Sequence, residues 1–280
     1  MGRITVRPPV LRIEGASART RPDEVVVEEP LEIRVGGTAL AVTMRTPGDD
    51  VDLALGFLTT EGVITSAGDV VTARFCAGAT DGDANTYNVL DVALRSIVAV
   101  PPSAARQFYV SSSCGVCGKA SIDAVRTRTA YPVADDDLAI GTDVLASLPV
   151  TLRARQKVFD RTGGLHAAAL FTAKGELVSV REDVGRHNAV DKIVGDAVRC
   201  GALPLRGHVL LVSGRTSFEL VQKALMAGIP AIASVSAPSS LAVELATEAG
   251  MTLVGFLRGD TMNVYAGAHR IHQPLIEPVA

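Results

Sequence analysis

From residue 151 onward, short apolar strands alternate with helical segments, and this alternation constrains the fold more than any other feature of the sequence. Apolar stretches predict strands at 167–173, 176–182, 208–214, 229–236 and 251–259. A helical period of apolar residues predicts helices at 151–164, 186–199, 216–228 and 239–250. Such alternation is typical of an α/β domain with three αβα layers around a mixed, mostly parallel sheet. The first two strands, turning at Lys174 and Gly175, supply the antiparallel member.

The first part of the chain predicts a smaller α+β domain. Residues 28–47 alternate apolar and polar side chains around Gly36 and Gly37, which is typical of a β-hairpin. A helix is expected at 48–62, followed by strands at 88–100 and 107–110. The expected domains are a flexible tail at 1–23, an α+β domain at 24–148, a second domain at 149–272 and a tail at 273–280.

Composition excludes several classes of protein. The net charge of the 280 residues is −3, which gives no general attraction to nucleic acids or membranes. There is no tryptophan and only 4% of residues are aromatic, so a stacking platform for single-stranded nucleic acid is not expected. No apolar run reaches the ~20 residues that span a bilayer, and the arginine-rich start does not resemble a secretory signal.

Three loops are expected at the carboxyl ends of the parallel strands, where ligands of open α/β sheets bind. Each combines glycine and arginine with small hydroxyl or amide groups, which suits a phosphate-bearing ligand. The loop residues that we expect to hold such a ligand are Arg186, His187, Asn188, Ser213, Gly214, Arg215 and Thr216, with the segment 256–261 following the last strand. The spacing of Thr216 and Glu219 also predicts a capping box at the start of the helix.

Cys114 and Cys117 form the one closely spaced pair among the four cysteines. A zinc site would need further ligands, and neither a second Cys-x-x-Cys pair nor a His-x-x-x-His pair exists. A redox disulfide of the thioredoxin type is a weak match, because that motif follows the first strand of a βαβ unit. The glycine-rich surroundings instead favour a reactive thiolate that accepts a sulfur atom as a persulfide.

The order of a helix, a hairpin and repeated helix–strand units also matches the core of the zinc deaminases. In these enzymes a His-x-Glu sequence opens the second helix and a Pro-Cys-x-x-Cys sequence opens the third. Here His187 is in place, but Ala189 stands where the glutamate belongs, and Ser213 to Ser217 contain no cysteine. We therefore expect a cytidine-deaminase-like fold that binds no zinc.

Several long motifs then resemble one known family, the FdhD/NarQ formate dehydrogenase accessory sulfurtransferases. The segments that carry the resemblance are S-S-S-C-G-V-C-G-K-A-S, E-D-V-G-R-H-N-A-V-D-K, L-V-S-G-R-T-S-F-E, P-G-D-D-V-D-L-A-L-G-F-L-T-T-E-G and G-F-L-R-G-D-T-M-N-V-Y. The resemblance covers nearly the whole chain after Glu28.

The resemblance implies a function. Members of this family accept persulfide sulfur from a cysteine desulfurase and transfer it to the molybdenum cofactor in its bis-molybdopterin guanine dinucleotide form, for which GDP-like nucleotides are mimics. The cofactor then enters the catalytic subunit of formate dehydrogenase. The resemblance implies Cys114 as the persulfide carrier and Cys117 as its partner. It implies a cofactor-binding segment made of Phe256, Leu257, Arg258, Gly259, Asp260 and Thr261, and a cytoplasmic homodimer.

Two other functions stay open at this point. The chain could be a cofactor-binding chaperone whose thiols form a redox switch, or a zinc hydrolase on the deaminase fold.

Overall fold

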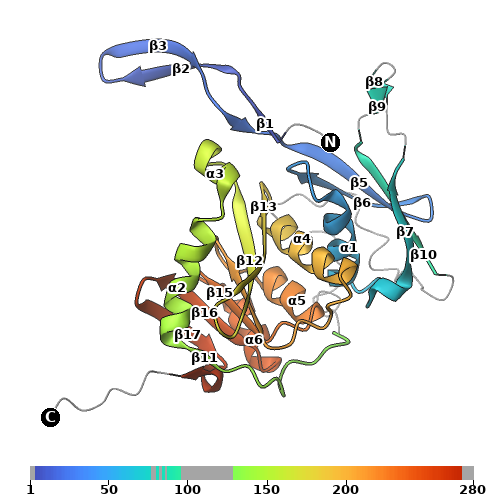
Figure 1. Cartoon of the computed structure of the whole chain (residues 1–280), viewed down its shortest axis with the longest axis vertical. Helices are drawn as coiled ribbons and strands as arrows, with labels where there is room; N and C mark the ends of the chain where they lie inside the picture. The colour runs from blue at the N-terminus through green and yellow to red at the C-terminus, as the bar shows by residue number, and fades with distance from the viewer. Residues whose placement is uncertain (1–3, 77–79, 82–83, 86, 96–128, 273–280) are drawn as a thin grey trace.

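The computed structural model describes residues 4–76, 80–81, 84–85, 87–95 and 129–272 (Figure 1). A six-stranded sheet forms the centre of the larger, C-terminal unit, with the strand order β13-β12-β14-β15-β16-β17. Its strands are β12 (His166–Thr172), β13 (Leu177–Asp183), β14 (His208–Val212), β15 (Ala231–Ser234), β16 (Thr252–Arg258) and β17 (Thr261–Ala266). Strands β14, β15 and β16 pair in parallel, whereas β12 and β17 run against their neighbours. The sheet is therefore mixed, as the sequence predicts, but only two of its five strand pairings are parallel, so the expectation of a mostly parallel sheet is wrong.

Helices cover both faces of this sheet. One face packs against α4 (Arg186–Arg199), α5 (Phe218–Met226) and α6 (Ser240–Glu248), and the other against α2 (Thr142–Arg153). Successive residues of β14 divide between the two cores, with Leu210 in the first and Leu211 in the second. This alternation follows from the two-residue period of a strand. The finer likeness to the cytidine deaminases stays a prediction.

The single helix expected at 151–164 is wrong. Helix α2 begins already at Thr142, ends at Arg153, and contains Pro149. A separate short helix, α3 (Lys157–Thr162), follows after a turn. Pro149 and the polar connector before it are not typical of a helix, so the sequence pattern did not indicate the start of α2 at Thr142. The expected domain boundary between 148 and 149 falls inside this helix. The turn-rich connector itself ends in β11 (Ile140–Gly141), which pairs with β18 (Ile271–His272) after the short helix η4 (Ala268–Arg270).

In the residues that the structure describes, the smaller unit is a four-stranded sheet of order β6-β5-β10-β7 packed with the helix α1 (Asp50–Thr60). Its strands are β5 (Glu29–Val35), β6 (Thr38–Arg45), β7 (Val70–Phe75) and β10 (Val89–Leu94), and the further short elements are η1 (Ala67–Asp69), β8 (Thr80–Asp81) and β9 (Ala84–Asn85). The hairpin of β5 and β6 turns at Gly36 and Gly37, both with positive φ, as predicted. Strand β7 was not predicted, and the strand expected at 107–110 lies outside the described residues.

The described part of the expected flexible tail at 1–23 is instead ordered into strands. Strands β2 (Pro9–Glu14) and β3 (Ser17–Pro22) form an antiparallel ribbon that projects from the body of the molecule (Figure 1). Its base is a second short pairing, between β1 (Thr5–Val6) and β4 (Val25–Val26).

The two units are joined by α1 and α4, which lie side by side (Figure 1). Val198 of α4 belongs to the apolar core of the smaller unit, together with Leu53 and Leu58 of α1. The two helices approach closely because Gly56 and Gly195 leave space for the opposite backbone. Within the part of the chain that the structure describes, no helix is long and apolar enough to cross a membrane.

Candidate anion-binding rim

The loops that follow β13, β14, β15 and β16 meet at one end of the large sheet, where these four strands have their carboxyl ends. We call this end of the sheet the rim. Backbone contacts join them. Thr216 forms a parallel bridge with Pro238, and the Phe256 amide donates a hydrogen bond to the Ser236 carbonyl at 3.1 Å. The side chain of Arg258 extends this series, because its Nε donates to the Val235 carbonyl at 3.0 Å. The structure thus brings together the three loops that the sequence singled out, and adds the loop 235–239.

A histidine–glutamate pair connects the start of α4 to the start of α5 at this rim. His187 Nε2 lies 2.8 Å from Glu219 Oε2 and 3.4 Å from Ser217 Oγ. The hydrogen bond from His187, together with the charges of His187, Lys223 and Arg186, lowers the pKa of Glu219, although burial opposes this shift. Glu219 therefore pairs with His187 and is not a partner in a capping box. The N-cap of α5 is Ser217, whose side chain makes no capping hydrogen bond.

His166 is a rim residue that the sequence did not reveal. It begins β12, which runs antiparallel to β14, so the amino end of β12 lies beside the carboxyl end of β14. A Cβ placed on Gly214 would lie 3.3 Å from the ring of His166, so this glycine allows the imidazole to approach the loop. Burial and the charges of Arg186 and His187 lower the pKa of His166. Its neutral form is therefore favoured.

Two buried polar atoms at the rim have no hydrogen-bond partner among the described residues. They are Oγ1 of Thr216, whose residue is 1% exposed, and Nε of Arg186. Leaving such groups unpaired costs about 1–3 kcal/mol each, and a ligand whose acceptor oxygens reached them would remove that cost. Arg215 and Arg258 are exposed beside them. The charge and the free donors of the rim fit an anionic ligand.

Other predicted site residues have different surroundings. Ser213 Oγ accepts a hydrogen bond from the Ala167 amide at 2.8 Å, which ties the loop after β14 to β12. Asn188 is buried and faces the smaller unit. Its Nδ2 donates to the Met44 carbonyl at 2.7 Å and to Asp183 Oδ1 at 3.0 Å, so both amide protons are already used. We therefore remove Asn188 from the residues that hold a ligand.

The segment 256–261 comprises the end of β16, the turn at Gly259 and Asp260, and the first residue of β17. Leu257 is fully buried in the core beneath α2, whereas Arg258, Gly259 and Asp260 are exposed. Phe256 has a φ of 52°, a backbone conformation that is uncommon for a residue with a side chain. The residue as a whole is 38% exposed. Of the six residues expected to contact a cofactor, Leu257 has a structural role.

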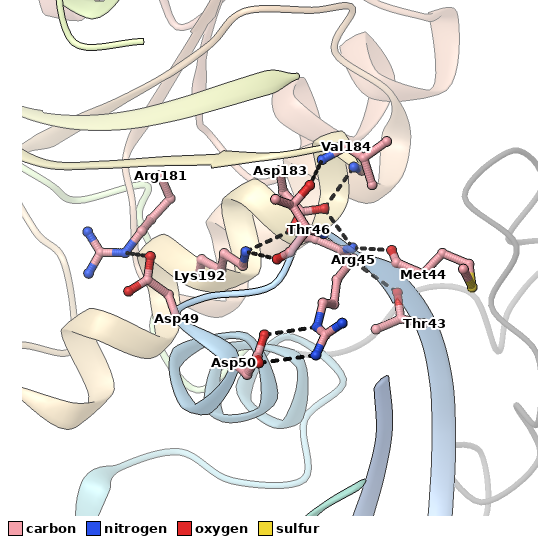
Figure 2. A network of polar contacts seen from close by, with 12 residues as sticks. Thr43, Met44, Arg45, Thr46, Asp49, Asp50, Arg181, Asp183, Val184 and Lys192 are labelled. Atoms are coloured by element: carbon pink, nitrogen blue, oxygen red, sulfur yellow. Dashed lines mark hydrogen bonds and ion pairs between the residues drawn. The ribbon is translucent and has the colours of Figure 1, made fainter. Parts of the chain in front are cut away.

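Behind the rim, Asp183 organises the junction of the two units (Figure 2). This carboxylate is completely buried. It pairs with Lys192 Nζ at 2.8 Å and accepts hydrogen bonds from the backbone amides of Thr46 and Gly185. Lys192 also donates to the Thr46 carbonyl at 3.0 Å. The E-D-V-G-R-H-N motif thus serves mainly to attach α4 to the strand β6 and only partly to form the rim.

A second buried lysine, Lys223 of α5, also pairs with a buried aspartate. Lys223 Nζ of α5 lies 2.8 Å from both carboxylate oxygens of Asp191 and 2.9 Å from Thr60 Oγ1 of α1. Because buried charges are tolerated only when they are paired and hydrogen-bonded, these contacts fix α1, α4 and α5 relative to one another. The position of His187 and Glu219 at the rim depends on that packing.

Cys114 and Cys117 lie outside the described residues. Within the described ranges, the structure brings together no group of three His, Cys, Asp or Glu residues that could hold a metal ion. Cys76 and Cys200 are free thiols, and Cys200 is exposed.

Fold and rim together define a mixed α/β protein with a basic edge suited to an anionic ligand. The comparisons with known proteins make the assignment more specific. The model of the FdhD/NarQ family matches residues 26–272, and the chain belongs to this family.

Relatives and a solved structure agree with this assignment. The chain is 62% identical over 273 residues to the sulfur carrier protein FdhD of Streptomyces avermitilis, covering 97% of each chain. It is 58% identical to that of Nocardia farcinica, covering 96% of each, and 55% identical to that of Mycobacterium tuberculosis, covering 97% of this chain and 100% of the other. A solved structure from Desulfotalea psychrophila, of a candidate formate dehydrogenase accessory protein, has the same fold. Its TM-score is 0.75 at 22% identity, over 96% of this chain and 100% of that one.

Proposed function

We propose that this protein is a sulfur carrier that accepts persulfide sulfur from a cysteine desulfurase and transfers it to the bis-molybdopterin guanine dinucleotide form of the molybdenum cofactor, as formate dehydrogenase activity requires. The observation that carries the proposal is the family membership over residues 26–272, with relatives named as sulfur carriers at up to 62% identity. The place of action is the cytoplasm, and the active species is a homodimer.

Cys114 receives the sulfur. Its thiolate attacks the terminal sulfur of the desulfurase persulfide, a new S–S bond forms on Cys114, and the desulfurase cysteine leaves as a thiolate. No electrons are gained or lost overall in this exchange. Cys117, three positions further along the chain, is the neighbouring thiol that accepts or releases the sulfur.

The rim supports the second half of the proposal, in which the molybdenum cofactor is the bound substrate. Arg186, Arg215 and Arg258 offer charge-assisted donors to the pyrophosphate oxygens. Thr216 Oγ1 and Arg186 Nε are buried donors without a protein partner among the described residues, and phosphate oxygens supply the acceptors that they lack. Phe256 offers an exposed ring to a guanine base.

Two cysteine-to-alanine variants, made one at a time, test the carrier role. We expect Cys114→Ala to abolish the activity of formate dehydrogenase in cells that depend on this protein, while binding of GDP to the purified protein is unchanged. The matched control is Cys200→Ala, which removes an exposed thiol of α4's C-cap and leaves activity intact. Full activity of Cys114→Ala would exclude Cys114 as the carrier.

The alternative function is a cofactor-binding chaperone in which the two thiols act as a redox switch. Mass spectrometry of the protein after incubation with a desulfurase and cysteine separates the two functions. A persulfide on Cys114 supports the carrier, whereas a Cys114–Cys117 disulfide without added sulfur supports the chaperone. Bound zinc found by elemental analysis would instead favour a hydrolase on this fold.

A further inference from the structure

Strands β2 and β3 pair only with each other among the described residues, in a separate two-stranded sheet. This ribbon extends from the body of the molecule (Figure 1). Most of its strand residues are exposed, and the others are half-buried. A single two-stranded hairpin is only marginally stable in water. The ribbon also lies before residue 26, where the match to the family model begins.

The two faces of the ribbon differ sharply in chemistry. Residues directly opposite each other in an antiparallel pair lie on the same face. One face therefore combines Pro9 with Pro22, Leu11 with Thr20, and Ile13 with Ala18. Leu11 is 63% and Ile13 68% exposed, which places two large apolar side chains in water. Such a contiguous apolar face on an exposed element is typical of an interaction surface.

The other face is basic. Arg12 is directly opposite Arg19, and Arg21 is opposite Val10. Glu14 is the one carboxylate on the ribbon, and it contacts both Arg12, at 2.7 Å, and Arg19, at 3.3 Å. Like charges directly opposite each other are destabilising, and one carboxylate does not balance three guanidinium groups. An acidic surface on a partner would complement this face.

The base of the ribbon is attached beside the rim. Glu24 pairs with Arg161 of α3 at 3.1 Å and with Arg7 at 3.2 Å. A Cβ on Gly164 would lie 3.2 Å from Val26 of β4, so the strand packs directly on the segment that leads from α3 to His166. The base of the ribbon therefore lies beside the segment that leads into His166 of the rim.

The size of the ribbon limits what it can bind alone. Two paired strands of six residues are about 20 Å long and about 10 Å wide, so one face covers about 200 Å². A specific interface needs about 800 Å² per partner. The remaining area must come from the surface at the base of the ribbon, which is the rim side of the molecule. The protein that takes a cofactor from the rim has to approach this same side.

We propose that the β2–β3 ribbon is a docking arm for the acceptor protein that receives the cofactor from the rim, and that this acceptor presents an acidic, partly apolar surface to it. The inference rests on the proposed function, in which the acceptor is the catalytic subunit of formate dehydrogenase. The apolar face gives the contact its affinity, and the arginines increase the rate of encounter.

Binding of the full-length protein to immobilised, cofactor-free catalytic subunit of formate dehydrogenase tests this proposal by biolayer interferometry. We expect Leu11→Ser with Ile13→Ser to raise Kd at least about 10-fold. We expect Arg12→Glu with Arg19→Glu to lower the association rate about 10-fold and to weaken the salt dependence of that rate. The matched control is Val150→Ser with Val178→Ser, two exposed valines on α2 and β13, which leaves Kd unchanged.

Each other outcome has a definite meaning. Equal Kd values for the wild type and both ribbon variants, or no binding by the wild type, would overturn the proposal. So would ribbon variants that lose only desulfurase binding, or that only change a dimer to a monomer in sedimentation, because the occupant would then be the sulfur donor or a second copy. All variants should bind GDP like the wild type. If the wild type itself does not bind GDP, the proposed function fails, and the binding result for the ribbon can still be interpreted.

Discussion

Gly56 of α1 and Gly195 of α4 make room for each other's helix at the junction of the two units. A Cβ on Gly56 would lie 1.8 Å from the backbone oxygen of Asp191, and a Cβ on Gly195 would lie 1.7 Å from that of Asp52. Each aspartate lies one helical turn before the glycine of its own helix and contacts the glycine of the other helix, so the contact is reciprocal. This crossing brings the buried charges of α1, β6 and α4 within hydrogen-bonding distance.

The first prediction concerns this crossing. In an isolated helix, Gly→Ala stabilises by about 1 kcal/mol, but here the new methyl group overlaps with backbone atoms. We expect Gly195→Ala to destabilise the protein by about 2–4 kcal/mol in urea unfolding, since overpacking against backbone costs at least as much as in a core. Glu244→Ala on the exposed surface of α6 is the control. A more stable Gly195→Ala protein would show that the helices do not pack this closely.

The second prediction concerns the pair of Asp183 and Lys192, whose side chains are 0% and 2% exposed. Asp183→Asn leaves a buried lysine without a counter-charge, and we expect a loss of about 3–5 kcal/mol. Asp160→Asn breaks a pair with Arg153 in which both side chains are 52% exposed, so its cost should not exceed about 1 kcal/mol. Equal losses in chemical denaturation would contradict the buried network.

The third prediction concerns pH. His166 has a pKa below its ordinary value of 6.5 in the folded protein, mainly because of burial. The unfolded chain therefore binds more protons at this residue below pH 6.5, and folding stability should fall as the pH drops from 6.5 through the folded pKa. In a plot of melting temperature against pH, His166→Gln should flatten the curve below pH 6.5. His272→Gln changes an exposed histidine and serves as the control. Identical profiles for His166→Gln and the wild type would refute the assignment.

The fourth prediction concerns the exposed arginines of the rim. Charge-assisted hydrogen bonds contribute about 1.5–3 kcal/mol, so Arg215→Ala or Arg258→Ala should weaken GDP binding about 10-fold or more in calorimetric titration. Arg153→Ala, on α2 at the opposite face of the sheet, is the matched control and should bind GDP normally. An unchanged affinity in either rim variant removes that arginine from the site.

The fifth prediction separates ligand binding from folding at Thr216. Its buried hydroxyl has no partner among the described residues, so Thr216→Val should leave stability unchanged or raise it slightly. The same variant should weaken GDP binding about 3- to 10-fold, which corresponds to one lost hydrogen bond. Thr60→Val is the contrast, because its hydroxyl bonds Asp191 and Lys223, and it should lower stability without affecting GDP binding.

Local patterns predicted much of the fold. Helix α4 spans Arg186–Arg199, the range that its apolar period indicates. The hairpins of β5 with β6 and of β12 with β13 turn where glycines were recognised. These features succeed because helical period, strand alternation and turn residues depend on neighbours only a few positions away in the chain.

Other features escaped the sequence because their causes are not local. Strand β17 exists because it pairs with β16, and neither its alternation nor its turn at Gly259 distinguished it from a loop. The E-D-V-G-R-H-N motif predicts a ligand loop, but two of its members contact residues more than 130 positions away: Asn188 bonds Met44 of β6, and Asp183 bonds Thr46 directly after this strand.

The sequence by itself determined the family, the alternation of strands and helices and the positions of the two thiols at 114 and 117. Only the tertiary structure decided which polar residues lie at the rim and which hold the two units together. The physical reason is that a buried aspartate or asparagine must form hydrogen bonds with the groups that folding brings next to it. Those groups can be any distance away in the sequence. His166, Glu219 and Thr216 belong to the rim because packing of α1, α4 and α5 brings their strand and helix ends to one edge.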